Sequence, residues 1–89
     1  MHMAKTGICG TMESNDCLIT VTEGEGISVQ VNSIVYDFFG ENILSVIMDT
    51  LKELGVDNVN VRCDDKGALD YTIKARLVTA LARMEGKDA

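Results

Sequence analysis

Hydrophobic and polar residues alternate along four short stretches of the chain, and this alternation predicts four β-strands. The stretches are Lys5–Met12, Cys17–Thr22, Ile27–Asn32 and Asn58–Cys63. Successive side chains on a strand point to opposite faces, so each stretch presents one apolar face to a core. The third stretch, with its isoleucine and valines at every second position, has the cleanest alternation.

Two longer segments carry apolar residues at helical spacing and predict two amphipathic helices. The first stripe consists of Ile43, Leu44, Ile47, Met48, Leu51 and Leu54. It is preceded by four apolar residues at near-helical spacing, Ile34, Val35, Phe38 and Phe39. The second stripe consists of Leu69, Ile73, Leu77, Ala80, Leu81 and Met84. Asn32-Ser33 is the expected N-cap of the first helix. We expect Gly40 to divide a short leading turn from the main helix, and Gly55 to take the left-handed conformation after its last turn.

The resulting order, β-β-β-α-β-α, predicts an α+β fold. We expect a two-layer sandwich in which two helices pack on one face of a mostly antiparallel four-stranded sheet. The loop Glu23–Gly26 favours a second hairpin, so the simplest topology is a three-strand meander followed by a helical crossover to the fourth strand. We expect one domain over residues 1–89, with residues 1–4 and 85–89 disordered.

The connection between the first two strands, Gly10-Thr11-Met12-Glu13-Ser14-Asn15-Asp16, predicts a hairpin with a serine at its tip. The three residues from Ser14 onward are turn formers, because short polar side chains hydrogen-bond nearby backbone groups. Glycine inside a strand often marks a bulge or a close backbone approach, which we expect at Gly7 and Gly10. From turn chemistry alone, the role of Ser14 is to serve the turn.

Net charge and hydropathy exclude two classes of function. The 89 residues carry a net charge of −6, whereas nucleic-acid binding needs a basic patch. No apolar run is long enough to span a membrane. The N-terminus has a single Lys5 and no apolar stretch typical of a signal peptide, so we expect a soluble cytoplasmic protein.

The chain lacks the residue patterns of a catalytic or metal centre. Its single histidine is His2. Its three cysteines, Cys9, Cys17 and Cys63, form no CxxC pair. We therefore expect these cysteines to be small core or half-buried residues in a reducing compartment. Asp64 and Asp65 favour a solvated loop before a helix over a metal site. Lys74, Arg76 and Arg83 are typical of a solvated helix face. The sequence therefore indicates a binding, carrier or regulatory domain.

Two motifs at matching spacing resemble those of a known family. Residues 10–16, Gly-Thr-Met-Glu-Ser-Asn-Asp, and residues 64–70, Asp-Asp-Lys-Gly-Ala-Leu-Asp, are similar to the corresponding segments of citrate lyase acyl carrier proteins, the small γ subunits of that complex. The likeness continues through residues 31–33, 39–40, 76–77 and 80–83, and covers nearly the whole chain. Departures include Cys9, ahead of the first motif, and the compact Glu23–Gly26 loop, and neither removes the serine.

The resemblance implies a carrier function with no catalytic side chain of its own. In that family the serine matching Ser14 carries phosphoribosyl-dephospho-coenzyme A through a phosphodiester, and the arm holds an acetyl or citryl thioester. It implies three partners: an α subunit that exchanges acetyl for citryl, a β subunit that cleaves citryl-carrier to oxaloacetate and acetyl-carrier, and the prosthetic-group transferase, holo-citrate lyase synthase. Glu13 and Asp16 flank the site, either for recognition by these partners or as solvated turn residues.

Two alternatives remain open. One is the carrier subunit of malonate decarboxylase, which uses the same type of arm with different partners. The other is an unmodified regulatory or scaffold domain that binds a ligand or subunit noncovalently. The helical acyl carrier proteins fit less well, because their modified serine opens a helix and Ser14 lies between strand-like stretches.

Overall fold

The computed structural model describes residues 4–87 and contains six elements in the expected order. They are β1 (Thr6–Gly10), β2 (Cys17–Glu23), β3 (Ile27–Ser33), α1 (Tyr36–Leu54), β4 (Val59–Asp65) and α2 (Asp70–Met84). Of the termini that we expect to be disordered, residues 1–3 and 88–89 lie outside the described residues. Residues 85–87 extend the end of α2, where the Lys87 N–H donates to the Ala82 carbonyl at 2.8 Å.

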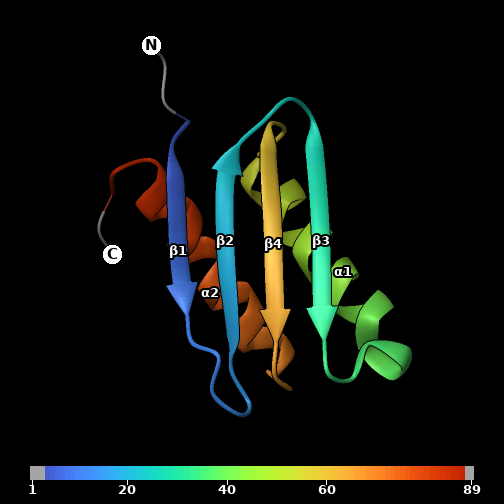
Figure 1. Cartoon of the computed structure of the whole chain (residues 1–89). Helices are drawn as coiled ribbons and strands as arrows, with labels where there is room; N and C mark the ends of the chain where they lie inside the picture. Colours follow the sequence, from blue (N-terminus) through green and yellow to red (C-terminus); the bar gives the residue numbers. More distant parts are fainter. Residues whose placement is uncertain (1–3, 88–89) are drawn as a thin grey trace.

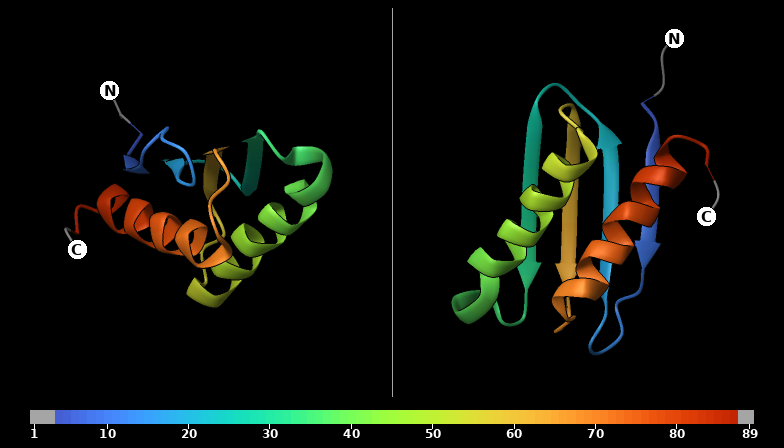
Figure 2. Two further views of the ribbon diagram at one scale, coloured as in Figure 1. Left: turned by 90° about the horizontal axis from the view of Figure 1, so that it is seen from below. Right: turned by 180° about the vertical axis from the view of Figure 1, so that it is seen from behind.

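The predicted two-layer α+β architecture is confirmed. Both helices lie on the same face of the four-stranded sheet (Figures 1 and 2). Helix α2 packs against β1 and β2, and α1 packs against β3 and α2. Two of the three strand pairings are antiparallel, and the pairing of β3 with β4 is parallel. Within residues 4–87, neither helix is long and apolar enough to cross a membrane.

The strand order differs from the expected meander. The order across the sheet is β1-β2-β4-β3, so β4 lies between β2 and β3. The loop Glu23–Gly26 therefore does not close a second hairpin but crosses over the start of β4 (Figure 1). Two hydrogen bonds hold this crossing: the Val59 N–H donates to the Gly26 carbonyl at 2.9 Å, and the Gly26 N–H donates to Asn58 Oδ1 at 3.0 Å. A Gly-rich loop is flexible enough to span one strand, and strand periodicity carries no information about sheet order.

The start of α1 also differs from the expectation. Strand β3 continues through Ser33, and the helix begins at Tyr36 with Val35 as its N-cap. The helix runs through Gly40 without a break. Glycine is favoured at this position because a Cβ would collide with the Tyr36 ring. At the other end, Gly55 has φ 68°, which confirms the predicted left-handed residue after the last turn.

The core lies between the sheet and the two helices. Its buried side chains come from every element except the outer strand β3, and they are Cys9, Cys17, Ile19, Val21, Ile43, Ile47, Leu51, Val59, Val61, Cys63, Ile73, Leu77, Ala80, Leu81 and Met84. All three cysteines are buried and free, as predicted. The predicted close approach at Gly7 is confirmed, because a Cβ there would overlap the Ala80 carbonyl oxygen of α2.

Three connections meet at one edge of the sheet. The β1–β2 turn, the β3–α1 connection and the β4–α2 loop all lie at the bottom of Figure 1, and both helices begin there. The positive ends of two helix dipoles consequently face the same edge as Ser14. Residues 10–16 and 64–70, which are far apart in sequence, become neighbours at this edge.

We predict that Gly7→Ala destabilises the fold. The added methyl group must displace β1 from α2, and overpacking of this kind costs about 1–3 kcal/mol. The measurement is the free energy of unfolding from urea titration. Ser28→Ala, on an exposed position of β3, serves as the control and should change it by less than about 0.5 kcal/mol. Equal stabilities of the two variants would contradict the close packing of β1 on α2.

Candidate functional site

Ser14 lies at the tip of the turn that joins β1 to β2, which confirms the predicted hairpin. The Asp16 N–H donates to the Glu13 carbonyl at 3.2 Å and closes the turn, while Asn15 takes φ 65°. Asparagine tolerates this left-handed conformation better than most residues. The Ser14 side chain is exposed, and its hydroxyl has no hydrogen bond to any residue in the range 4–87. The turn thus presents a free hydroxyl to solvent.

The base of the turn is fixed by backbone geometry and by Thr11. Gly10 has φ 111°, and a Cβ there would overlap the Cys17 carbonyl oxygen, so only glycine fits. The Thr11 N–H donates to the Cys17 carbonyl at 3.2 Å. The Thr11 hydroxyl donates to Asp16 Oδ2 at 2.8 Å and accepts the Glu13 N–H at 3.2 Å. The strands are therefore joined directly below the serine.

Asp16 is an organising residue of the turn, although the sequence suggested either partner recognition or a solvated position. Its carboxylate accepts the Cys17 N–H at 2.7 Å and Arg76 Nε at 3.1 Å, the latter from α2. The Arg76 guanidinium and the Thr11 hydroxyl hold the pKa of Asp16 at about 2, below its usual 3.8. Arg76 consequently has a specific partner, which corrects the expectation of a solvated helix face. Glu13 remains exposed.

The β4–α2 loop binds the Ser14 turn through its backbone. The Asn15 N–H donates to the Lys66 carbonyl at 2.8 Å, and the Lys66 N–H donates to the Asp16 carbonyl at 2.9 Å. These two bonds extend the β2–β4 ladder beyond its last pair, Cys17 with Asp65. The Asn15 side chain lies next to Gly67, where a Cβ would stand 3.6 Å from Asn15 Oδ1. The two motifs found in the sequence therefore form one unit.

Asp65 holds this loop in place, and its environment overturns the expectation of a solvated carboxylate. The residue is 1% exposed. Its carboxylate accepts the Ser33 hydroxyl at 2.7 Å, the Gly67 N–H at 3.1 Å and the Ala68 N–H at 2.9 Å. The neighbouring Asp64 has different partners, Arg62 Nε at 3.1 Å and Asn32 Nδ2 at 3.3 Å. The two carboxylates thus serve separate structural contacts, and no group of three or more potential metal ligands occurs within residues 4–87.

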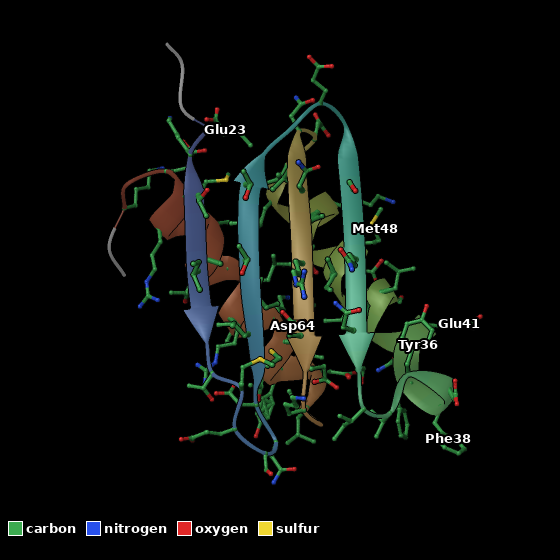
Figure 3. All side chains as sticks on the ribbon, in the orientation of Figure 1. Glu23, Tyr36, Phe38, Glu41, Met48 and Asp64 are labelled. Atoms are coloured by element: carbon green, nitrogen blue, oxygen red, sulfur yellow. The ribbon has the colours of Figure 1, made fainter. Side chains whose placement is uncertain are left out.

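Large apolar side chains surround this edge of the sheet. The aromatic side chains of Tyr36 and Phe38 project from the first turn of α1 (Figure 3). The sequence placed Phe38 and Phe39 with the helix's apolar stripe, yet they are 85% and 55% exposed. Leu69 and Tyr71, at the start of α2, are also exposed. Neighbouring exposed apolar side chains of this size are typical of a site that another molecule covers.

The three cysteines lie next to residues 10–16 and 64–70 in the sequence, but their thiols are buried in the core. Cys17 follows the Ser14 turn, and its thiol shares a hydrogen bond with that of Cys63. This hydrogen bond and burial raise the pKa of the Cys63 thiol well above its ordinary range. A thiol that keeps its proton is a weak nucleophile. The same hydrogen bond lowers the pKa of the Cys17 thiol, so it is burial, which all three cysteines share, that makes the thiols poorly suited to carry an acyl group.

The chain matches one family model and many curated relatives. The model described as "Malonate decarboxylase delta subunit (MdcD)", an acyl carrier protein family, matches residues 4–84. The chain is 48% identical to the citrate lyase acyl carrier protein of Oenococcus oeni, over 93% of this chain and 87% of that protein. It is 47% identical to the Streptococcus mutans protein of the same name, over 93% and 83% of the two chains. The Treponema denticola protein of that name is 40% identical, over 98% and 100%.

We predict that Asp65→Asn destabilises the fold much more than Asp64→Asn. The first substitution turns one buried acceptor oxygen into a donor and leaves at least one N–H or hydroxyl unpaired, at a cost of about 2 kcal/mol or more. The second weakens a surface ion pair with Arg62, worth less than about 1 kcal/mol, and at most the long hydrogen bond from Asn32. Urea titration of both variants gives the comparison. A smaller loss in Asp65→Asn than in Asp64→Asn would contradict the assigned contacts.

We predict that carboxyl NMR titration gives Asp16 a pKa of about 2, and that Arg76→Met raises it towards 3.8. Because the folded-state pKa lies below the unfolded value, this group stabilises the fold above about pH 4. That contribution disappears as the pH falls through about 2. Lys74→Met, whose ion pair is with Glu53 at 2.9 Å, is the matched control and should leave the Asp16 titration unchanged. An ordinary Asp16 pKa in the unsubstituted protein would refute the assignment.

Proposed function

The chain belongs to the citrate lyase acyl carrier protein family, and on that basis we propose that it carries an acyl group on a prosthetic arm attached to Ser14. The attachment is a phosphodiester to phosphoribosyl-dephospho-coenzyme A. When bound, the arm supplies the thiol on which an acetyl or citryl group is held as a thioester. The chain itself contributes the attachment point and no catalytic side chain.

The observation that carries this proposal is the exposed, unpartnered hydroxyl on an otherwise fixed turn. A modifying enzyme must reach the oxygen of Ser14, and the hairpin tip leaves it open to solvent. The same enzyme needs a defined backbone around that oxygen, which the bonds of Asn15 and Asp16 to Lys66 supply. A rigid base also means that the reach of the carrier is set by the arm rather than by movements of the domain.

The buried cysteines support a thiol that comes from the arm. Cys17 and Cys63 are 0% exposed, and a buried thiol cannot meet the active site of another protein. The acyl group therefore needs an external thiol on a long tether. Ser14 faces solvent, whereas the three cysteines of the neighbouring strands face the core.

We propose that the partners are the α and β subunits of citrate lyase and the transferase that loads the arm. In the complete complex the loaded chain visits the acyltransferase and the citryl-carrier lyase in turn, and citrate is cleaved to oxaloacetate and acetate. The names of the relatives support citrate lyase. The description of the family model keeps the carrier subunit of malonate decarboxylase as the second candidate.

We predict that the chain, purified from its native host, has an intact mass increased by one phosphoribosyl-dephospho-coenzyme A group. Ser14→Ala should abolish this increase, because the hydroxyl oxygen is the acceptor. Ser28→Ala, which removes an exposed hydroxyl from β3, should keep it. An unmodified mass, or an increase that persists in Ser14→Ala, would refute attachment at Ser14.

We predict that the same native preparation contains citrate-cleaving activity in the complex that retains the chain. The complex is purified by an affinity tag on this chain and is then assayed with citrate and with malonate as substrates. Oxaloacetate formation from citrate supports the first assignment. Decarboxylation of malonate with no citrate cleavage would establish the second candidate in its place.

A further inference from the structure

A cavity of about 380 Å³ opens between the start of α1 and the β4–α2 loop, the loop that binds the Ser14 turn. Its apolar walls are Val35, Phe39 and Ile43 from α1 and its approach, together with Ala68 and Leu69 from the loop. Its volume lies at the lower end of the roughly 300–1,000 Å³ that small-molecule sites occupy. Phe39 and Leu69 remain 55% and 61% exposed at its mouth. A small apolar ligand would remove part of this surface from water.

We propose that this cavity is the resting site for the thioester end of the prosthetic arm, an inference that rests on the proposed attachment at Ser14. The loop that forms one wall is the loop that binds the serine turn. Lys66 exchanges two backbone hydrogen bonds with that turn, and the next residue, Gly67, lines the cavity. An arm long enough to reach the active sites of two partners is also long enough to fold back to this neighbouring wall.

The charges around the cavity determine which part of the arm it accepts. Asp70 stands at the rim, where its Oδ1 accepts Asn42 Nδ2 at 2.8 Å, and Asp65 lies at the base with three hydrogen bonds of its own. Among residues 4–87, no basic side chain lines the cavity. The carboxylates of Asp65 and Asp70 offset the positive ends of the two helix dipoles at this edge, so anionic phosphates and the carboxylates of a citryl group gain no net attraction here. The uncharged pantetheine tail with a small neutral acyl group, such as acetyl, fits both the volume and the charge.

A second cavity near the turn is a weaker candidate. It is lined by Met12 and Ile34 with several polar residues, and its volume is about 210 Å³. This is below the usual range for small-molecule sites.

Docking of the acetyl end in the larger cavity has a functional consequence: it shields the thioester from water and other nucleophiles while the carrier is between partners. A citryl group, being charged, stays outside and available.

The test uses protein whose arm is loaded and acetylated, as verified by intact mass. In two-dimensional ¹H–¹⁵N NMR spectra, the acetylated and the unmodified forms should differ at Gly67–Asp70 and around Phe39, in addition to the turn itself. Phe39→Glu places a charge in the mouth and should abolish the differences away from the turn. Phe38→Glu adds the same charge on the adjacent residue, which is 85% exposed and does not line the cavity, and should preserve them.

The second readout is the rate at which hydroxylamine removes the acetyl group. If the docked state is populated about nine times in ten, deacetylation is about tenfold slower than in Phe39→Glu. Phe38→Glu should match the unsubstituted protein. Circular dichroism confirms that both variants are folded, and Ala68→Leu, which fills the cavity with an uncharged group, should also accelerate deacetylation.

Three results would overturn the proposal. Spectral differences confined to residues 13–16 would mean that the arm swings free. Differences at Met12 and Ile34 would place the arm in the smaller cavity, and equal deacetylation rates in Phe38→Glu and Phe39→Glu would show no protection. Absence of any added mass on Ser14 would instead refute the attachment, and the resting site with it, so the two failures are distinguished in one sample.

Discussion

The buried carboxylate of Asp65 is the constraint on which the functional edge of this protein depends. A carboxylate removed from water must find donors, since an unpaired buried charge is far more costly than an unpaired neutral group. The donors here come from the end of β3, through Ser33, and from the loop that follows β4, through Gly67 and Ala68. The requirement to satisfy one side chain therefore fixes a loop that has no regular structure. That loop in turn provides the backbone groups that bind the Ser14 turn.

The central position of β4 makes this arrangement possible. Because β4 lies between β2 and β3, its last residue is beside the start of β2 on one side and the end of β3 on the other. In a simple meander, β4 would be the outermost strand, separated from β2 by β3. The unexpected strand order is thus what brings residues 64–70 to residues 10–16. The position of the serine turn follows from the topology rather than from the turn sequence alone.

Sequence reasoning recovered the parts of the structure that periodicity encodes and missed those that depend on pairing across the chain. The alternating and helical patterns predicted all six elements, and the turn residues placed Ser14 at a hairpin tip. The partner of Asp16 is Arg76, 60 positions away, and no local pattern links the two. Asp65 could have been found, because alternation in β4 places it on the same buried face as Val59, Val61 and Cys63. The adjacent Asp64 obscured this signal, since two neighbouring carboxylates suggest a solvated loop.

A carrier that holds a reactive thioester must keep it from its own nucleophiles, and the placement of the thiols meets that demand. An acyl group moves readily between thiols, so an exposed cysteine near Ser14 would compete with the arm. Cys17 is only three residues from Ser14, yet its side chain points into the core and is 0% exposed. Hydrogen bonding to Cys17 and burial keep Cys63 protonated, because both raise its pKa. The alternation of β2 therefore does more than build a core: it turns the thiol nearest to the proposed attachment point away from solvent.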